Sequence, residues 1–266
     1  MPDFVKFLAF DTSTDRMSVA LTDGVCVWQH SGPGGAQASS TLIPAILALL
    51  AESGMALGSL DAIAFGRGPG SFTGLRTACA VAQGLAFGAN HGAGIAVLPI
   101  DTLMALAEEA RFQHAGTQAV DAGSLSITAL LDARMDEIYV QSYEFDGQVC
   151  RPLDLCRLMR PENIELPAAA TLLAGNVFGV YAGRLPSALG ALPRVEALPT
   201  AAALLRLAPA LAAAGQCVPA ALALPLYVRD KVALTTEERD QLKQRAVETA
   251  LAPVQPPTPP AVPAAL

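Results

Sequence analysis

A glycine-rich run in the first third of the chain constrains the fold more than any other feature. Four glycines and a proline fall between Gly66 and Gly74, after the apolar residues 62–65 and before a run of small residues. This order predicts a strand, a tight loop and a helix that begins near residues 71–74. Glycine lets another group approach the backbone closely, and a helix start presents unpaired N–H groups. The loop therefore either holds an anion such as phosphate or forms a corner at which strand and helix pack.

Two segments far apart in the chain share one pattern, in which an apolar strand ends in aspartate and a polar turn leads into a returning strand. Asp11 ends the first strand and Asp132 ends the second. This spacing favours two similar α/β lobes over a short-period repeat. We therefore expect an N-terminal lobe over residues 1–100 and a C-terminal lobe over residues 101–232. A polar and proline-rich tail follows over residues 233–266, and its six closely spaced prolines predict an extended, mobile segment.

Composition limits where the protein works and what it binds. The chain has 266 residues, of which 52% are hydrophobic and 15% charged, enough to bury a large core. No apolar run approaches the roughly 18 residues of a membrane span, and the N-terminus lacks the features of a signal peptide. A cytoplasmic location without membrane contact is the resulting expectation. The net charge of -7 predicts that another protein provides most of the contacts to any nucleic acid, because phosphates are bound by basic surfaces.

Candidate chemical groups are few, and each has a structural alternative. The turn that begins at Asp11 can orient Mg²⁺ and phosphate, or it can be a polar turn that caps its own backbone. Asp132, Asp136 and Glu137 can perform acid–base chemistry or form a solvated turn. The three histidines are isolated, and the five cysteines form no CxxC pair. We therefore expect no metal site and no cofactor, and we expect the cysteines to be reduced and buried.

Two helices are predicted in the N-terminal half, and both have wide apolar faces. The first is capped by residues 39–41 and runs to Ser53, with Gly54 closing it and Pro44 tolerated in its first turn. The second begins near residues 71–74 and runs to about Gly88. Its two glycines, Gly84 and Gly88, lower helix stability by about 1 kcal/mol each relative to alanine. Glycines at such positions favour a close neighbour. That neighbour is either the protein's own sheet or the helices of a partner.

Four segments together resemble the TsaB (YeaZ) family of bacterial tRNA threonylcarbamoyladenosine biosynthesis proteins, and the match spans roughly residues 4–232. The glycine-loop motif is the most specific of the four. The matching segments read FLAFDTST from Phe7, GRGPGSFTGLR from Gly66, LDARMDEIY from Leu131 and PLYVR from Pro225.

The resemblance implies an α/β fold of the actin-like ATPase-domain type (ASKHA, ribonuclease H-like), with two similar lobes built on mixed sheets. It also implies a non-catalytic subunit that binds and activates a TsaD-type transferase, together with a TsaE-type ATPase. That complex modifies the adenosine beside the tRNA anticodon, so that this chain meets tRNA only indirectly, and a homodimer is a further possibility. The partner interface implied on the two helices comprises Leu42, Ile43, Ile46, Leu50, Leu75, Ala78, Cys79, Ala82 and Leu85.

The alternative function is a stand-alone phosphotransferase or ATPase of the actin-like fold. It would use Asp11 and the glycine loop on ATP. The turn that begins at Asp11 contains no lysine to bind a phosphate. Its absence favours the interpretation of the glycine-rich loop as a packing corner. A vestigial nucleotide or anion site remains the second interpretation, and its residues would be Asp11, Thr12, Ser13, Gly68, Gly70, Ser71 and Thr73.

Overall fold

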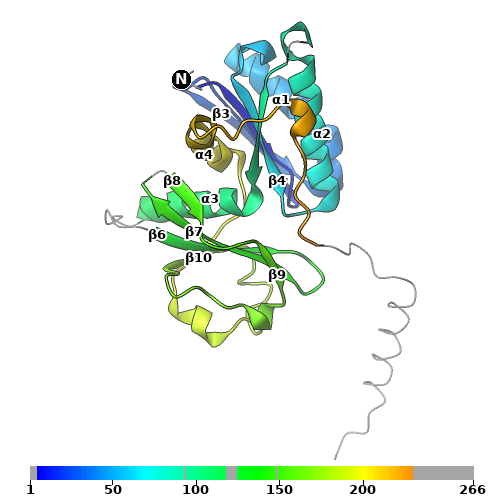
Figure 1. Cartoon of the computed structure of the whole chain (residues 1–266). Helices are drawn as coiled ribbons and strands as arrows, with labels where there is room; N and C mark the ends of the chain where they lie inside the picture. The colour runs from blue at the N-terminus through cyan, green and yellow to red at the C-terminus, as the bar shows by residue number, and fades with distance from the viewer. Residues whose placement is uncertain (1–4, 93, 118–124, 148, 230–266) are drawn as a thin grey trace, which may run out of the picture. The chain divides into compact units, whose positions relative to one another are not determined.

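The first half of the chain forms a five-stranded mixed sheet in the order β3-β2-β1-β4-β5. We describe it in a computed structural model that covers residues 5–92, 94–117, 125–147 and 149–229. Strand β1 pairs antiparallel with β2 and parallel with β4 (Figure 1). The strands are β1 (Phe7–Asp11), β2 (Arg16–Thr22), β3 (Val27–Pro33), β4 (Ala62–Gly68) and β5 (Ala96–Asp101).

The second sheet repeats this plan with the order β11-β10-β6-β7-β8, and β9 also pairs with β7. Strand β6 pairs antiparallel with β7 and parallel with β10, as β1 does with β2 and β4. The expectation of an α/β fold with two mixed sheets is therefore confirmed, and Asp11 and Asp132 end equivalent strands. The strands are β6 (Leu125–Asp132), β7 (Ile138–Asp146), β8 (Val149–Pro152), β9 (Arg157–Met159), β10 (Leu172–Gly175) and β11 (Arg194–Glu196).

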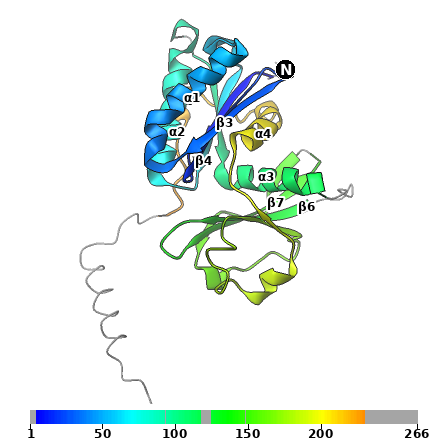
Figure 2. The ribbon, with the colours of Figure 1, turned by 180° about the vertical axis from the view of Figure 1, so that it is seen from behind.

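Helices cover both faces of the first sheet, which explains why residues 7–10 and 62–65 of its central strands are all apolar. Leu8 and Phe10 pack under α1 and α2, whereas Phe7 and Ala9 point to the opposite face and pack under α3 and α4. Figure 2 shows α1 and α2 side by side, away from α3 and α4. The helices are α1 (Ala38–Ser53), α2 (Phe72–Gly88), α3 (Thr102–Thr117) and α4 (Ala201–Ala213), and the short 3-10 helices are η1 (Gly35–Gln37), η2 (Leu57–Ser59), η3 (Ala89–Gly92), η4 (Pro161–Asn163), η5 (Ser187–Ala191) and η6 (Ala220–Leu222).

One core cluster joins the two sheets through α3 and α4. It includes Ala9 of β1, Leu106 of α3, Ala129 of β6 and Leu204 of α4, all fully buried. Helix α4 thus follows the second sheet in sequence but packs on the first. The boundary at residue 100 stays a prediction, and the tail over residues 233–266, with its expected mobility, lies outside the described residues.

The start of α1 differs from the prediction. The helix begins at Ala38, directly after η1, and no side chain caps it. The hydroxyls of Ser39, Ser40 and Thr41 instead donate to carbonyls of the preceding turn, such as that of Gln37. Pro44 consequently lies inside the helix and not in its first turn, whereas Gly54 closes it with a φ of 69°, as expected.

The expectation that no apolar stretch reaches the length of a membrane span also needs correction. Among the described residues, the helical stretch Gly35–Ser53 has the length and apolar composition of a span by those two criteria alone. Its fully buried side chains Leu42 and Ile46 pack on the first sheet. Core helices with one buried face pass the same test, so this composition is weak evidence for a membrane segment.

Candidate functional site

The turn after β1 is buried against the glycine-rich loop. Asp11 and Thr12 have no exposed surface, and Ser13 is 3% exposed. The Oδ1 atom of Asp11 accepts hydrogen bonds from the Ser13 amide (2.9 Å) and the Ser13 hydroxyl (2.6 Å). The Thr12 hydroxyl donates to the carbonyl of Gly74 at 2.7 Å. The turn therefore caps its own backbone and joins the start of α2.

Three glycines of the loop are required by this contact. A Cβ atom on Gly66 would overlap Oδ2 of Asp11, and one on Gly74 would overlap the carbonyl oxygen of Thr12. A Cβ atom on Gly70 would lie 2.6 Å from the carbonyl oxygen of Ser13, whose partner is the amide of Ser71 at 2.7 Å. The loop lies so close to the turn that only glycine fits at these positions.

The fourth glycine, Gly68, leaves room for a C-terminal segment, residues 223–228, which we call the strap. Gly68 has a φ of 124°, a conformation that favours glycine, and a Cβ atom there would overlap the carbonyl oxygen of Leu226. The amide of Leu226 donates to the carbonyl of Arg67 at 2.7 Å. Cys79 and Gln83 of α2 donate from their side chains to the carbonyl of Ala223. The strap, orange in Figure 1, is thereby held against β4 and α2.

These contacts favour the packing-corner interpretation of the glycine loop. Of the predicted anion-site residues, Asp11, Thr12, Ser13 and Gly68 are buried, Gly70 is half-buried, and only Ser71 and Thr73 are exposed. At the corner, the Ser71 amide is already bonded to the β1–β2 turn and the Arg67 carbonyl to the strap. An anion-binding role for the seven residues stays a prediction.

Burial raises the pKa of Asp11 to about 6, although its hydrogen bonds with Ser13 oppose that shift. The ordinary value is 3.8, so between pH 4 and 6 the folded protein keeps a proton that the unfolded chain has lost. The contribution of this carboxyl group to the free energy of unfolding is therefore fully present below about pH 4 and is lost as pH rises through 6. The difference between the two pKa values corresponds to about 3 kcal/mol of stability.

Asp11→Asn, which cannot titrate, should remove this dependence. We expect the free energy of unfolding of the wild type to fall by about 3 kcal/mol relative to Asp11→Asn between pH 3 and pH 7. Urea denaturation at half-unit pH steps measures the difference. Parallel stability curves for the two proteins would contradict the buried, titrating carboxyl group.

The helix residues predicted to meet a partner lie mostly inside the protein itself. Seven of the nine side chains are buried, Leu85 is half-buried, and Ile43 is 44% exposed. The buried side chains pack on the first sheet or under the glycine loop, so the protein's own sheet covers this apolar face. The close neighbour expected at Gly84 and Gly88 is not found, because no described atom lies within 4 Å of a Cβ position at either glycine. The buried seven are Leu42, Ile46, Leu50, Leu75, Ala78, Cys79 and Ala82.

The opposite side of the two helices is also apolar and faces solvent. Ile43 and Leu47 of α1 are 44% and 56% exposed, and Phe72 and Phe87 of α2 are 37% and 56% exposed. We call these four residues, with the small Ala80 and Gly84 between the two phenylalanines, the outer face. Sequence periodicity did not single it out, because α1 is apolar around most of its circumference.

The turn after β6, like the turn after β1, is bonded to segments that lie far away in the sequence. Oδ1 of Asp132 accepts hydrogen bonds from the Arg134 amide and the Tyr181 hydroxyl, both at 2.9 Å. Burial, followed by this bond to Asp132, raises the pKa of Tyr181 to about 12. Asp136 forms an ion pair with Arg184 at 2.7 Å. Tyr181 and Arg184 had no signal in the sequence, since they are brought to the turn by the loops after β10.

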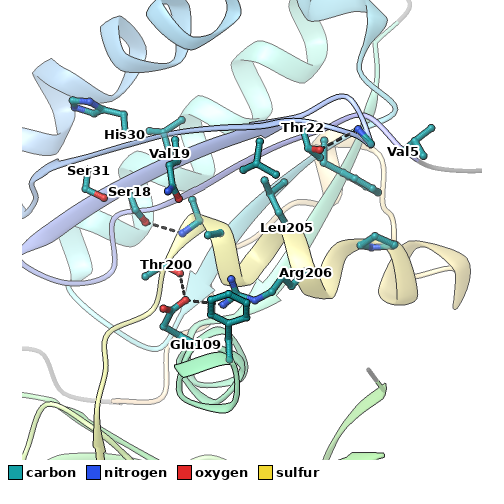
Figure 3. Close-up of a pocket in the computed structure, with 18 residues that line it drawn as sticks. Val5, Ser18, Val19, Thr22, His30, Ser31, Glu109, Thr200, Leu205 and Arg206 are labelled. Atoms are coloured by element: carbon teal, nitrogen blue, oxygen red, sulfur yellow. Dashed lines mark hydrogen bonds and ion pairs between the residues drawn. The ribbon is translucent and has the colours of Figure 1, made fainter. Parts of the chain in front are cut away.

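A pocket of about 680 Å³ opens between α4 and the β2–β3 side of the first sheet. Figure 3 shows Thr200 and Arg206 directed at Glu109, and both donate to its Oε2 atom at 2.7 Å. Burial raises the pKa of Glu109, but these hydrogen bonds outweigh it and hold the pKa below the ordinary value. The polar groups at this end of the pocket therefore link α3 to α4.

Within the described ranges, no three histidine, cysteine, aspartate or glutamate side chains are grouped to hold a metal ion. The cysteines are free thiols: Cys79 is buried, Cys150, Cys156 and Cys217 are half-buried, and Cys26 is exposed. The expectation of buried cysteines is therefore wrong for Cys26, which lies in the β2–β3 loop.

Comparison with known proteins relates the chain to tRNA modification. A family model described as "TsaD: tRNA N6-adenosine threonylcarbamoyltransferase" matches residues 33–154. Relatives named tRNA threonylcarbamoyladenosine biosynthesis protein TsaB include those of Haemophilus influenzae, 41% identical over 51% of this chain and 52% of the relative, and Escherichia coli, 35% identical over 53% and 56%. The chain thus spans about half the length of these curated relatives.

A solved structure matches over a longer range. YeaZ from Pseudomonas aeruginosa is 37% identical, with a TM-score of 0.73 over 84% of this chain and 99% of that one. The two mixed sheets and their helices have the actin-like ATPase-domain fold expected from the resemblance. Because nearly all of YeaZ is covered at this identity, the chain belongs to the TsaB (YeaZ) family.

Proposed function

We propose that this protein is a non-catalytic cytoplasmic subunit required for formation of N6-threonylcarbamoyladenosine beside the anticodon of tRNA. It binds and activates a TsaD-type transferase, and a TsaE-type ATPase completes the complex. The names of the relatives support the pathway. The observation that supports binding is the outer face of α1 and α2.

Four large apolar side chains on two adjacent helices form a surface of the kind that marks protein interfaces. Both helices fall within residues 33–154, the segment that resembles the transferase model. A transferase partner of this fold therefore offers helices of the same kind, and the four helices can pack about a pseudo-twofold axis. A homodimer would use the same face and compete with the transferase.

The charge of the chain is consistent with an indirect role toward tRNA. The net charge is -7, whereas a protein that holds RNA by its phosphates presents a basic face. The transferase would then provide most of the RNA contact. The buried β1–β2 turn likewise supports a role without phosphoryl transfer, because Asp11 is covered by Gly66 and has no exposed surface.

Reconstitution tests the proposal. Purified TsaC-, TsaD- and TsaE-type proteins from the same organism, with tRNA, threonine, bicarbonate and ATP, should form modified nucleoside at least about 100-fold faster when this chain is present. Nucleoside analysis by mass spectrometry measures the product. Equal product formation without the chain would refute an activating role.

The alternative, a stand-alone phosphotransferase or ATPase, makes a different prediction for the isolated chain. It requires tight binding of Mg·ATP that is lost in Asp11→Ala. We expect calorimetric titration of the isolated chain to show no such binding. A micromolar dissociation constant that depends on Asp11 would favour the alternative.

A further inference from the structure

Two aromatic rings and an arginine form a cluster at the N-terminal end of α2. The guanidinium carbon of Arg76 lies 3.8 Å from the centre of the Phe72 ring. Its Nε atom donates to the Tyr227 hydroxyl at 3.0 Å, and the Phe72 and Tyr227 ring centres are 5.4 Å apart. Phe72 is 37% and Tyr227 46% exposed. The three side chains are thus ordered by one another and still reach solvent.

The strap holds this cluster in place. Tyr227 follows Leu226, whose amide bonds to Arg67 and whose carbonyl fills the space beside Gly68. The strap is also bonded to Cys79 and Gln83, one and two turns along α2 from Arg76. The two motifs GRGPGSFTGLR and PLYVR, which lie far apart in the sequence, therefore meet here. A side chain held in this way loses little entropy when a partner binds.

The cluster continues into the outer face. Phe72, Arg76, Ala80 and Gly84 follow one another at intervals of four residues, so they lie in one row along α2. All four are exposed, and Phe87 extends the row. A partner that packs on the outer face therefore reaches the cluster without a break.

Arg76 is the only basic residue in α1 and α2. Its Nε atom donates to the Tyr227 hydroxyl, and the described residues offer no acceptor to its two terminal nitrogens. Guanidinium groups bind carboxylates through two parallel hydrogen bonds. The chemistry of the cluster thus fits a carboxylate flanked by an apolar side chain.

We infer that Phe72, Arg76 and Tyr227 form the anchor at which this protein binds the transferase subunit. The anchor receives a partner carboxylate on Arg76 and an apolar side chain against the two rings. Tyrosine and arginine are enriched among the few residues that dominate binding at protein interfaces. This inference rests on the proposed function, since it names the binding determinant of the same interface.

Binding of the full-length chain to the purified TsaD-type transferase, measured by calorimetry, tests the inference. We expect Arg76→Ala and Tyr227→Ala to raise the dissociation constant at least tenfold. Tyr227→Phe, which keeps the ring and loses the bond to Arg76, should raise it threefold or more. A rise from 50 to 500 mM NaCl should weaken the wild type more than Arg76→Ala. Melting temperatures identify any variant that fails to fold.

Phe112→Ala is the matched control, because Phe112 is 55% exposed and also carries a stacked arginine, Arg206, at 4.2 Å. It lies on α3, away from the outer face, and should bind like the wild type. Leu47→Asp tests the outer face itself. If Leu47→Asp abolishes binding while Arg76→Ala and Tyr227→Phe stay within twofold of the wild type, the anchor is refuted and the proposed function stands. If the wild type does not bind, both are refuted.

Discussion

Gly74→Ala should lower the free energy of unfolding by about 3 kcal/mol or more, the upper part of the range for overpacked cores. Gly74 lies in the first turn of α2, where the new Cβ atom would overlap the carbonyl oxygen of Thr12. That carbonyl belongs to a buried turn and cannot move without breaking the bonds between Asp11 and Ser13. The main chain of the turn or the helix must therefore shift.

Gly84→Ala in the same helix is the matched control. No atom lies within 4 Å of the Cβ position at Gly84, which faces solvent. Alanine there should stabilise the protein by up to about 1 kcal/mol through helix propensity alone. Urea denaturation followed by circular dichroism measures both changes. Equal stabilities for the two variants would show that the corner tolerates a side chain and that its glycines serve another purpose.

Aspartate at two successive positions of α1 should have very different effects on stability. Ile46 has no exposed surface and packs in the core beneath the helix, whereas Leu47 is 56% exposed. Ile46→Asp should destabilise the fold by about 4 kcal/mol or more, because it removes core packing and buries a carboxylate. Leu47→Asp should change stability by no more than about 0.5 kcal/mol.

The same pair separates folding from partner binding. Leu47→Asp should remain folded and weaken binding to the transferase at least 100-fold, because it places a charge in the middle of the apolar outer face. Thermal unfolding and calorimetry on the same samples give both quantities. A folded Leu47→Asp that binds like the wild type would place the interface elsewhere, and a stable Ile46→Asp would contradict the described packing of α1.

The long elements could be predicted closely because they follow simple patterns of apolar residues. Strands β1 and β4 begin with continuous apolar runs, and β6 is largely apolar, as expected for strands buried on both faces. Strands β8, β9 and β11 were missed, since three or four residues at a sheet edge leave no periodicity to detect. The start of α1 was placed late, because serine and threonine hydroxyls that favour caps here bond to the preceding turn.

The candidate interface shows the limit of such patterns. On α1, Ile46 and Leu47 are equally apolar neighbours, and nothing local distinguishes the one that is buried from the one that is exposed. The choice depends on which side of the helix the sheet occupies. The residues first assigned to a partner are those that the sheet covers, and the outer face became visible only once the helix was placed.

The sequence by itself determined the two strand–aspartate turns and the presence of a glycine corner, because apolar runs and glycine each restrict the backbone locally, and its resemblance to the TsaB family implied the fold. Only the tertiary structure decided what the corner packs against and which helix faces are free. It brings Tyr227 to Arg76 across 151 positions of sequence. Contacts at such separation depend on how whole elements pack, and no short-range pattern of residues encodes that packing.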